Sequence, residues 1–176
     1  MRIIHGKYRS RRLDLPKKLR ARPTTDQARE SLFNILINRL YFSDIKVLDL
    51  FSGTGSISLE FASLETNDIT LVEKNRFHVQ FINKNIELLG IEGINVIQGD
   101  VFTFLKRNHV KYDVIFADPP FDLPNLKDLP DLALPHLSDS DSEFILEHGP
   151  SNNFSEHPKH KDTRRYGKVH FSFFGI

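Results

Sequence analysis

The chain has 176 residues, of which 39% are hydrophobic and 27% are charged, and this length and composition predict a single domain over 1–176. Cysteine is absent, which excludes disulfides, thiolate metal sites and a cysteine nucleophile. No apolar run approaches the ~20 residues needed to span a membrane, and the start does not resemble a secretory signal. We therefore expect a cytoplasmic protein that neither enters a membrane nor carries a metal.

The net charge of +1 hides a strong asymmetry. Residues 1–29 hold ten Lys and Arg against two Asp, a net charge of +8, so the other 147 residues sum to −7. A basic end on an acidic body indicates a polyanionic partner, although a solvated basic tail is the alternative. Apolar residues alternate with these charges, which favours a folded hairpin. The cations expected to grip nucleic-acid phosphates are Lys7, Arg9, Arg11, Arg12, Lys17, Lys18, Arg22 and Arg29.

In chain order, the pattern predicts a basic arm over 1–22 with two short strands around residues 6–10, followed by a helical segment over 23–40. Thr24 and Gln27 have capping-box spacing at the start of that helix, and Asp26 lies in its first turn. The remainder, 45–176, alternates strands with helices, which is typical of a parallel sheet covered on both faces. Strands are expected at 45–51, 69–73, 94–98, 112–117, 144–147, 164–166 and 169–174, the last antiparallel, with helices at 56–64, 75–89, about 101–108 and about 125–136.

A glycine turn follows the first strand of this core, in the sequence Asp49-Leu50-Phe51-Ser52-Gly53-Thr54-Gly55. Glycines let the backbone turn sharply and approach a ligand, and the next helix then presents unpaired N–H groups. The third glycine of a dinucleotide-binding fingerprint is missing, because position 58 is Ser. Taken alone, the glycine pair is as well explained by an ordinary turn, and Ser58 argues against NAD(P) and an oxidoreductase.

Acidic residues follow the next two strands. A carboxylate at Glu73 can accept hydrogen bonds from both ribose hydroxyls, and one at Asp100 can accept an adenine amine, with the Val101 N–H available to the ring. Either acid alone is ordinarily a surface or helix-capping residue. The first strand ends in Asp and Gly residues, the second in Glu73 and the third in Asp100. Together these three strand ends predict a nucleoside pocket along the carboxyl edge of the sheet.

The fourth strand ends in Asp118-Pro119-Pro120-Phe121, and this motif points to the chemistry. The prolines stiffen the turn and remove N–H donors, so the Asp118 carboxylate and the Pro119 carbonyl both present acceptors. Two fixed acceptors can hold the hydrogens of a planar amine and direct its lone pair at an electrophile. Phe121 offers a stacking face for a base. We take these four residues as catalytic.

These segments resemble the RsmD family of 16S ribosomal RNA guanine-N2 methyltransferases. The similar segments are MRIIHGKYRSRRL, RPTTDQARESLFNIL, VLDLFSGTG, VEKN, IFADPPF and RRYGKV, in that order over nearly the whole chain. The resemblance implies a Rossmann-like class I methyltransferase fold with seven strands, and S-adenosylmethionine as cofactor, leaving S-adenosylhomocysteine (SAH). Three features depart from the family pattern: His5, Ser58, and a short polar stretch at 150–160. The cofactor-binding residues expected on this basis are Asp49, Phe51, Gly53, Gly55, Glu73, Lys74, Asp100, Val101 and Asp118.

The expected reaction is direct methyl transfer to a guanine N2 amine, with ribosomal RNA or the small subunit as partner and a monomeric enzyme. Thr24, Thr25, Arg29 and Glu30 are expected to close over the cofactor or to orient the target. Three alternatives remain: transfer to adenine N6 or to a glutamine amide, a non-catalytic RNA-binding module with a similar pocket, and an NAD(P) oxidoreductase. His157 and His160 lack the partners that a metal site needs.

Overall fold

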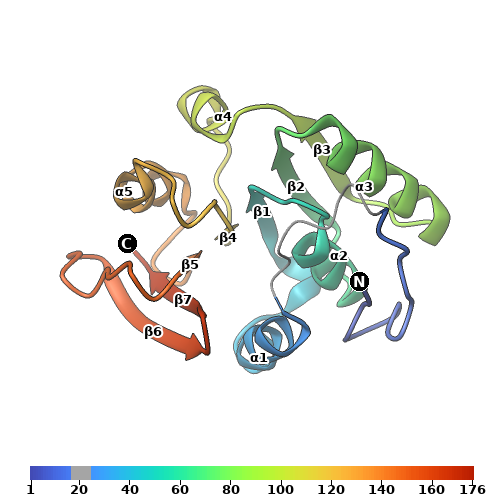
Figure 1. The fold of residues 1–176 in the computed structure, drawn as a ribbon, viewed down its shortest axis with the longest axis horizontal. Helices are drawn as coiled ribbons and strands as arrows, with labels where there is room; N and C mark the ends of the chain where they lie inside the picture. Colours follow the sequence, from blue (N-terminus) through green and yellow to red (C-terminus); the bar gives the residue numbers. More distant parts are fainter. Residues whose placement is uncertain (17–24) are drawn as a thin grey trace.

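The computed structural model describes residues 1–16 and 25–176, and its centre is a seven-stranded mixed sheet (Figure 1). The strands are ordered β3-β2-β1-β4-β5-β7-β6. Their bounds are β1 Lys46–Leu50, β2 Asp68–Glu73, β3 Ile94–Gln98, β4 Val114–Ala117, β5 Glu143–His148, β6 His160–Tyr166 and β7 Val169–Phe174. The α-helices are α1 Asp26–Ile37, α2 Ser56–Ser63, α3 Arg76–Leu89, α4 Val101–Arg107 and α5 Leu129–Ala133.

The strand order reverses at the centre of the sheet. From β1 the chain moves outward through β2 to β3, then returns to place β4 on the other side of β1 and continues to β5. All of these neighbours are parallel. Open sheets of this kind bind ligands beside the carboxyl ends of the strands where the order reverses. The ends of β1 and β4 meet at that position.

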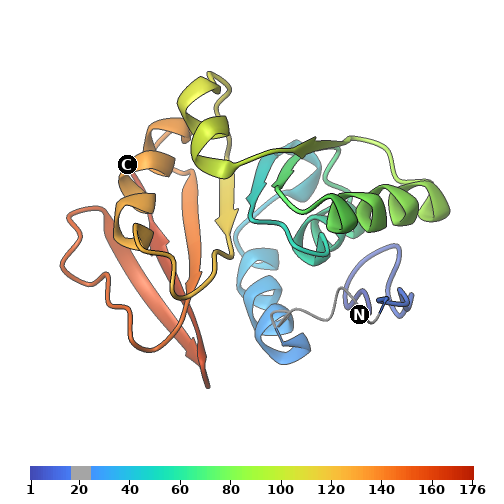
Figure 2. The same ribbon diagram turned by 45° about the horizontal axis from the view of Figure 1, so that its top comes forward.

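Alternating side chains of the strands pack into two separate cores. Val47 on β1 and Phe116 on β4 face one core, which α1, α2 and α3 cover. Leu48 and Ile115 face the other core, which α4 and α5 cover. Figure 2 shows these two helical layers on either side of the sheet. The expected parallel sheet with helices on both faces is confirmed.

The last strand is antiparallel, as expected, and it lies between β5 and β6. A hairpin turn at Gly167, with φ of 62°, joins β6 to β7. The insertion of β7 places Val169 and Phe171 next to the end of β5, with Phe171 opposite Glu147 in the register. The end of β5 is thereby enclosed between β4 and β7.

Three expected elements differ in form, and β6, expected at 164–166, begins four residues earlier, at His160. The helix expected at about 125–136 is divided into a 3-10 turn at Leu126–Asp128, α5, and a second 3-10 turn at Leu134–His136. Pro135 has no N–H to continue the helical ladder, which explains why α5 ends at Ala133. The fourth strand begins at Val114, two residues later than expected, because Tyr112 makes only an isolated bridge to Leu137.

The third difference concerns the basic arm. Within the described residues 1–16 the arm folds back as the expected hairpin, with the Ile3 N–H donating to the Arg11 carbonyl. The two strands expected there do not form, because the β-pairing within these residues is limited to one isolated bridge between Arg2 and Arg12. Helix α1 is capped by Thr25, whose hydroxyl accepts from the Ala28 N–H at 3.1 Å. The cap expected at Thr24 is therefore corrected to Thr25, and Ala28 has no side-chain acceptor to complete a capping box. Among the described helices, none is long and apolar enough to cross a membrane.

Candidate active site

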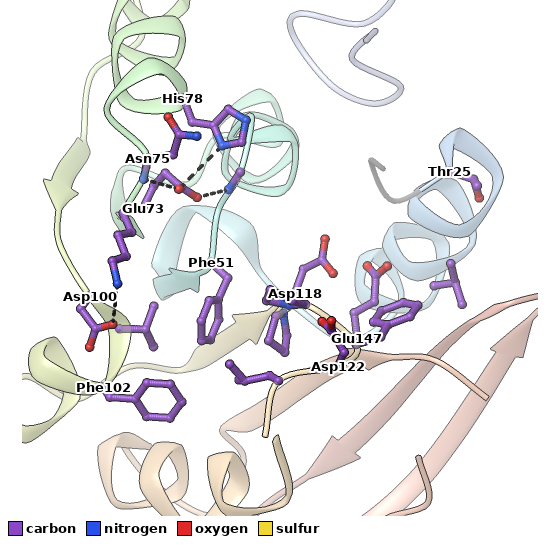
Figure 3. Close-up of a pocket in the computed structure, with 18 residues that line it drawn as sticks. Thr25, Phe51, Glu73, Asn75, His78, Asp100, Phe102, Asp118, Asp122 and Glu147 are labelled. Atoms are coloured by element: carbon purple, nitrogen blue, oxygen red, sulfur yellow. Dashed lines mark hydrogen bonds and ion pairs between the residues drawn. The ribbon is translucent and has the colours of Figure 1, made fainter. Parts of the chain in front are cut away.

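A cavity of ≈ 670 Å³ opens at the carboxyl edge of the sheet, where the strand order reverses. Gly53, from the turn after β1, and Asp118, from the turn after β4, line the same space. Ten expected site residues line it: Phe51, Gly53, Glu73, Lys74, Asp100, Val101, Asp118, Pro119, Pro120 and Phe121. The glycine turn and the double-proline turn therefore share one cavity (Figure 3).

The turn after β1 has three residues in the left-handed region. Phe51, Gly53 and Gly55 have φ of 56°, 55° and 73°. Phe51 is costly there because it carries a Cβ, so the surrounding contacts must hold it. Its ring lies edge-on to Phe102 with centroids 6.1 Å apart. In Figure 3, Phe51 lies between Glu73 and Asp100 on one side and Asp118 and Glu147 on the other.

Glu73 ends β2 and holds the glycine turn from the cavity side. Its Oε2 accepts from the Gly53 N–H at 2.7 Å, and its Oε1 accepts from the Asn75 N–H at 2.6 Å. His78 Nδ1 lies 3.7 Å from Oε1. Each carboxylate oxygen has two lone pairs, so Glu73 can accept further hydrogen bonds from a ligand. The side chain is fixed before any ligand arrives.

Asp100 follows β3 and has two roles. It caps α4, with Oδ1 accepting from the Thr103 N–H at 3.0 Å, and it also lines the cavity. The Thr103 N–H lowers the pKa of Asp100, and smaller contributions come from the Thr103 hydroxyl and from Lys74, whose Nζ lies 3.8 Å from Oδ2. Asp100 is therefore an ionised acceptor at neutral pH, beside the Val101 N–H, which has no partner within α4 because it lies in the first turn.

The double-proline turn is packed against both neighbouring strands. The Asp118 N–H donates to the Leu50 carbonyl at 3.3 Å, which ties the turn to the end of β1. The Phe121 ring packs closely against Gly149, since a Cβ built at Gly149 would be 2.8 Å from Cδ2 of that ring. The Asn152 amide donates to the Phe121 carbonyl at 3.4 Å. Gly149 thus leaves the space that the Phe121 ring occupies at the wall of the cavity.

Asp49 and Gly55 do not line the cavity, which corrects the expectation that they contact the ligand directly. Asp49 is 1% exposed, and its Oδ2 accepts from the Ser58 hydroxyl at 2.6 Å and from the Ser58 N–H at 3.2 Å. Burial raises the pKa of Asp49 to about 7, against the hydrogen bonds from Ser58. Ser58 therefore serves as the partner of a buried acid beneath the turn.

The basic arm is anchored to α2. The Lys7 N–H donates to the Ser63 carbonyl at 2.7 Å, and a Cβ at Gly6 would lie 1.8 Å from that oxygen, so only glycine fits. The anchored arm exposes four of the expected RNA-binding cations: Lys7, Arg9, Arg11 and Arg12. Arg29 is a correction, because it is 1% exposed and paired with Glu60 in the core.

The other expected residues are placed as follows. Thr25 lines the cavity, and Glu30 is exposed outside it. Four expected residues lie outside the described ranges: Lys17, Lys18, Arg22 and Thr24. In the described part of the chain, no group of three or more His, Asp and Glu could hold a metal ion.

Seven lining residues escaped the sequence analysis: Asn75, His78, Phe102, Asp122, Leu123, Glu147 and Val169. Glu147 could have been found, because it stands at the carboxyl end of the fifth strand, as Glu73 does on the second. His78 and Val169 gave no such signal. Their place in the site depends on the orientation of α3 and on the insertion of β7, which are tertiary features.

Comparisons with known proteins agree with this architecture. Residues 1–175 match the family model described as conserved hypothetical protein 95. The chain is 30% identical over 179 residues to the ribosomal RNA small subunit methyltransferase D of Buchnera aphidicola subsp. Baizongia pistaciae, covering 99% of this chain and 91% of that protein. It is similar to the solved structure of yhhF from Escherichia coli, with TM-score 0.84, 28% identity, and 99% and 97% of the two chains covered. The fold also matches that of SMU.776 complexed with SAH, with TM-score 0.70, 21% identity, and 88% and 50% covered.

Proposed function

The chain belongs to the conserved hypothetical protein 95 family, which is the RsmD family, and on that premise we propose that it transfers a methyl group from S-adenosylmethionine to the N2 amine of a guanine in small-subunit ribosomal RNA. The observation that carries this proposal is the single cavity lined by both Gly53 and Asp118. A nucleoside bound beside Gly53 and an amine held by Asp118 would therefore lie in the same cavity and could react directly.

The cavity fits the cofactor in size and in polar groups. Its volume of ≈ 670 Å³ is in the ordinary range for small-ligand pockets. Glu73, already fixed by two backbone N–H groups, has acceptor capacity for ribose hydroxyls, and Asp100 has it for an adenine amine. Phe51 and Phe102 supply apolar faces beside them. We assign the cofactor to this half of the cavity, with Asp49 and Gly55 supporting the turn from beneath.

Bound S-adenosylmethionine supplies a methyl group activated by a sulfonium. The chain's own residues prepare the acceptor. The Asp118 carboxylate and the Pro119 carbonyl accept the hydrogens of the amine and direct its lone pair, while Phe121 stacks on the base. The amine becomes acidic only as the new N–C bond forms and the S–C bond breaks. The proton then passes to Asp118 or to water, so no covalent enzyme intermediate is required.

The anchored arm provides the cationic side chains that contact the RNA phosphates. Lys7, Arg9, Arg11 and Arg12 are exposed on a segment that hydrogen bonds to α2, so their charges act from a fixed position relative to the cavity. Phosphate contacts of this kind position a nucleic acid without reading its sequence. We propose that the chain acts in the cytoplasm as a monomer and as one methyltransferase domain.

The test is to map methylated nucleosides in small-subunit ribosomal RNA from cells with and without this protein. Mass spectrometry should find one N2-methylguanosine that disappears without the protein and returns when the purified protein and S-adenosylmethionine are added to the unmethylated subunits or to their RNA. A methylated adenine in the RNA, or a methylated glutamine found by mass spectrometry of the subunit proteins, would favour the corresponding alternative acceptor if it depends on the protein. The proposal fails if no methyl group in ribosomal RNA depends on the protein.

A further inference from the structure

A cavity of ≈ 370 Å³ lies between the basic arm and α3, and we call it the α3 groove. The arm forms one wall, from Arg12 to Pro16, and Figure 1 shows this part of the arm beside α3. The other wall is formed by Phe77, Gln80, Phe81, Lys84, Asn85 and Leu88. These six positions recur three and four residues apart, so they form one stripe along α3, about 16 Å long. None of the described residues lines both this groove and the active-site cavity.

Two large apolar side chains of this stripe are open to solvent. Phe77 is 57% exposed and Leu88 is 71% exposed, whereas Phe81 between them is 8% exposed and packs into the core. An aromatic ring left in water forgoes the free energy that its burial would supply. The Asn75 side chain accepts from the Phe77 N–H at 2.8 Å, which holds the first turn of α3. The helix therefore presents an aromatic ring to solvent from a fixed backbone position.

Positive charge borders this ring. Two exposed cations line the groove, Lys84 from α3 and Arg12 from the arm. Asp14 is the one acid among the described residues that line it, and the exposed Arg76 directly precedes Phe77. Aromatic rings combined with cations are the surface that single-stranded nucleic acids bind, because bases stack on the rings and phosphates pair with the cations. The charge and the ring together favour an RNA strand over an apolar partner.

The groove begins at the edge of the active-site cavity. Asn75 and His78 line that cavity, and Phe77, in the same turn of α3, lines the groove. An enzyme that acts on a stacked base must first take this base out of its stack, which leaves the neighbouring base without a stacking partner. Phe77 lies where an aromatic ring can replace that partner.

We propose that the α3 groove binds the single-stranded RNA next to the target guanine, with a neighbouring base stacked on Phe77 and phosphates paired with Lys84 and Arg12. This inference rests on the proposed function and adds to it a subsite outside the active-site cavity. Stacking of this kind tolerates any base. The groove therefore contributes affinity for the strand and does not select the target nucleotide.

The first test measures binding to unmethylated small subunits across a salt series. Phe77→Ala should weaken binding by about 5- to 150-fold, the range for the loss of one stacked base, and should leave the salt slope unchanged because no phosphate contact is lost. Phe77→Trp, which keeps an aromatic ring, should bind within about 3-fold of the wild type. Lys84→Ala should lower the logarithmic salt slope by about 0.7 to 0.9.

The second test identifies what lies against the ring. The chain has no cysteine, so Phe77→Cys carries a benzophenone maleimide at that position alone. On irradiation with unmethylated subunits, the label should crosslink to ribosomal RNA within a few nucleotides of the mapped guanine.

Tyr41 provides the matched control for both tests. It is 84% exposed and precedes β1, at the opposite edge of the sheet from the cavity. Tyr41→Ala should keep the wild-type affinity, and labelled Tyr41→Cys should give no crosslink near the mapped guanine. Cofactor affinity, measured by calorimetry, checks that each variant is folded. If Phe77→Ala fails this check, Phe77→Leu, which keeps the apolar bulk without a ring, replaces it and should weaken binding by at least about 5-fold.

Two results overturn the assignment. One is an unchanged affinity in the folded Phe77→Ala, or in Phe77→Leu where that variant replaces it. The other is a label at position 77 that crosslinks to a ribosomal protein, or that crosslinks to RNA near the guanine no more than the label at position 41 does. Neither resembles the failure of the proposed function, in which the wild type methylates no guanine of the small subunit.

Discussion

The Nε of Arg29 donates to Oε1 of Glu60 at 3.2 Å, and both side chains are 1% exposed. Glu60 also accepts from the N–H groups of Ile4 and His5, at 2.8 and 3.1 Å. The pair therefore joins the basic arm, α1 and α2 at one buried point. Arg29 belongs to the basic end of the sequence, but it anchors that end instead of contacting a polyanion.

The first prediction concerns this pair. Glu60→Ala should lower the free energy of unfolding by about 3–5 kcal/mol, because it removes the buried carboxylate that pairs with Arg29 and that accepts from the Ile4 and His5 N–H groups. Glu87→Ala, at an exposed position of α3, is the control and should change stability by less than about 0.5 kcal/mol. Urea denaturation measures both. Equal, small effects would mean that the pair does not anchor the arm.

The second prediction concerns the buried acid beneath the glycine turn. Burial raises the pKa of Asp49 from 3.8 to about 7, so between these values the folded state holds a proton that the unfolded state has released. Stability should therefore fall as pH rises from 4 to 7, with Asp49 contributing at most about 1.4 kcal/mol per pH unit. Asp49→Asn should lack this contribution. The check is the difference in unfolding free energy between the two proteins across this range, and a constant difference would refute it.

The third prediction concerns the wall behind Phe121. Gly149→Ala would place a methyl group 2.8 Å from Cδ2 of that ring and must displace it. We expect kcat/KM for RNA to fall by about 10- to 100-fold, because a small misplacement of the stacking face disturbs the bound geometry. Cofactor affinity should not change. Gly99→Ala, whose added Cβ meets nothing closer than 4.0 Å, is the control and should keep wild-type kinetics.

The fourth prediction concerns the arm. Replacing Arg9, Arg11 and Arg12 together by Ala should weaken RNA binding and flatten its dependence on salt, by about 0.7 to 0.9 in the logarithmic slope for each phosphate that is no longer neutralised. Lys46→Ala, at the amino end of β1 and so at the opposite edge of the sheet, should leave the slope unchanged. Filter binding across a salt series measures both. An unchanged slope in the triple variant would show that these cations do not contact phosphates.

The fold could be predicted from the sequence because its strong signals are local. Period-2 and period-3.6 patterns located five parallel strands and the helices between them, and β3 was found to the residue. The errors are at positions where a tertiary contact decides the outcome. Tyr112 pairs only with Leu137, and Pro135 ends a helix that its neighbours favour.

The residues of the candidate site also fall into two groups: those that local sequence signals could assign, and those whose place depends on tertiary contacts. Residues that end a strand, such as Glu73 and Asp118, could be assigned because parallel strands bring their carboxyl ends to one edge. Arg29 could not be assigned correctly, since its charge resembles that of its exposed neighbours and its partner Glu60 is 31 residues away. Glu147 lies at the carboxyl end of the fifth strand, as Glu73 does on the second, so the same strand-end signal could have assigned it to the cavity.

The central claim is that Asp118 acts on the acceptor amine in a cavity that also holds the cofactor. The most direct test measures cofactor affinity and methyl transfer to unmethylated small subunits with Asp118→Ala and with the wild type. We predict a cofactor affinity close to that of the wild type and a loss of transfer of at least about 100- to 1000-fold. Near-wild-type transfer by Asp118→Ala would contradict the claim.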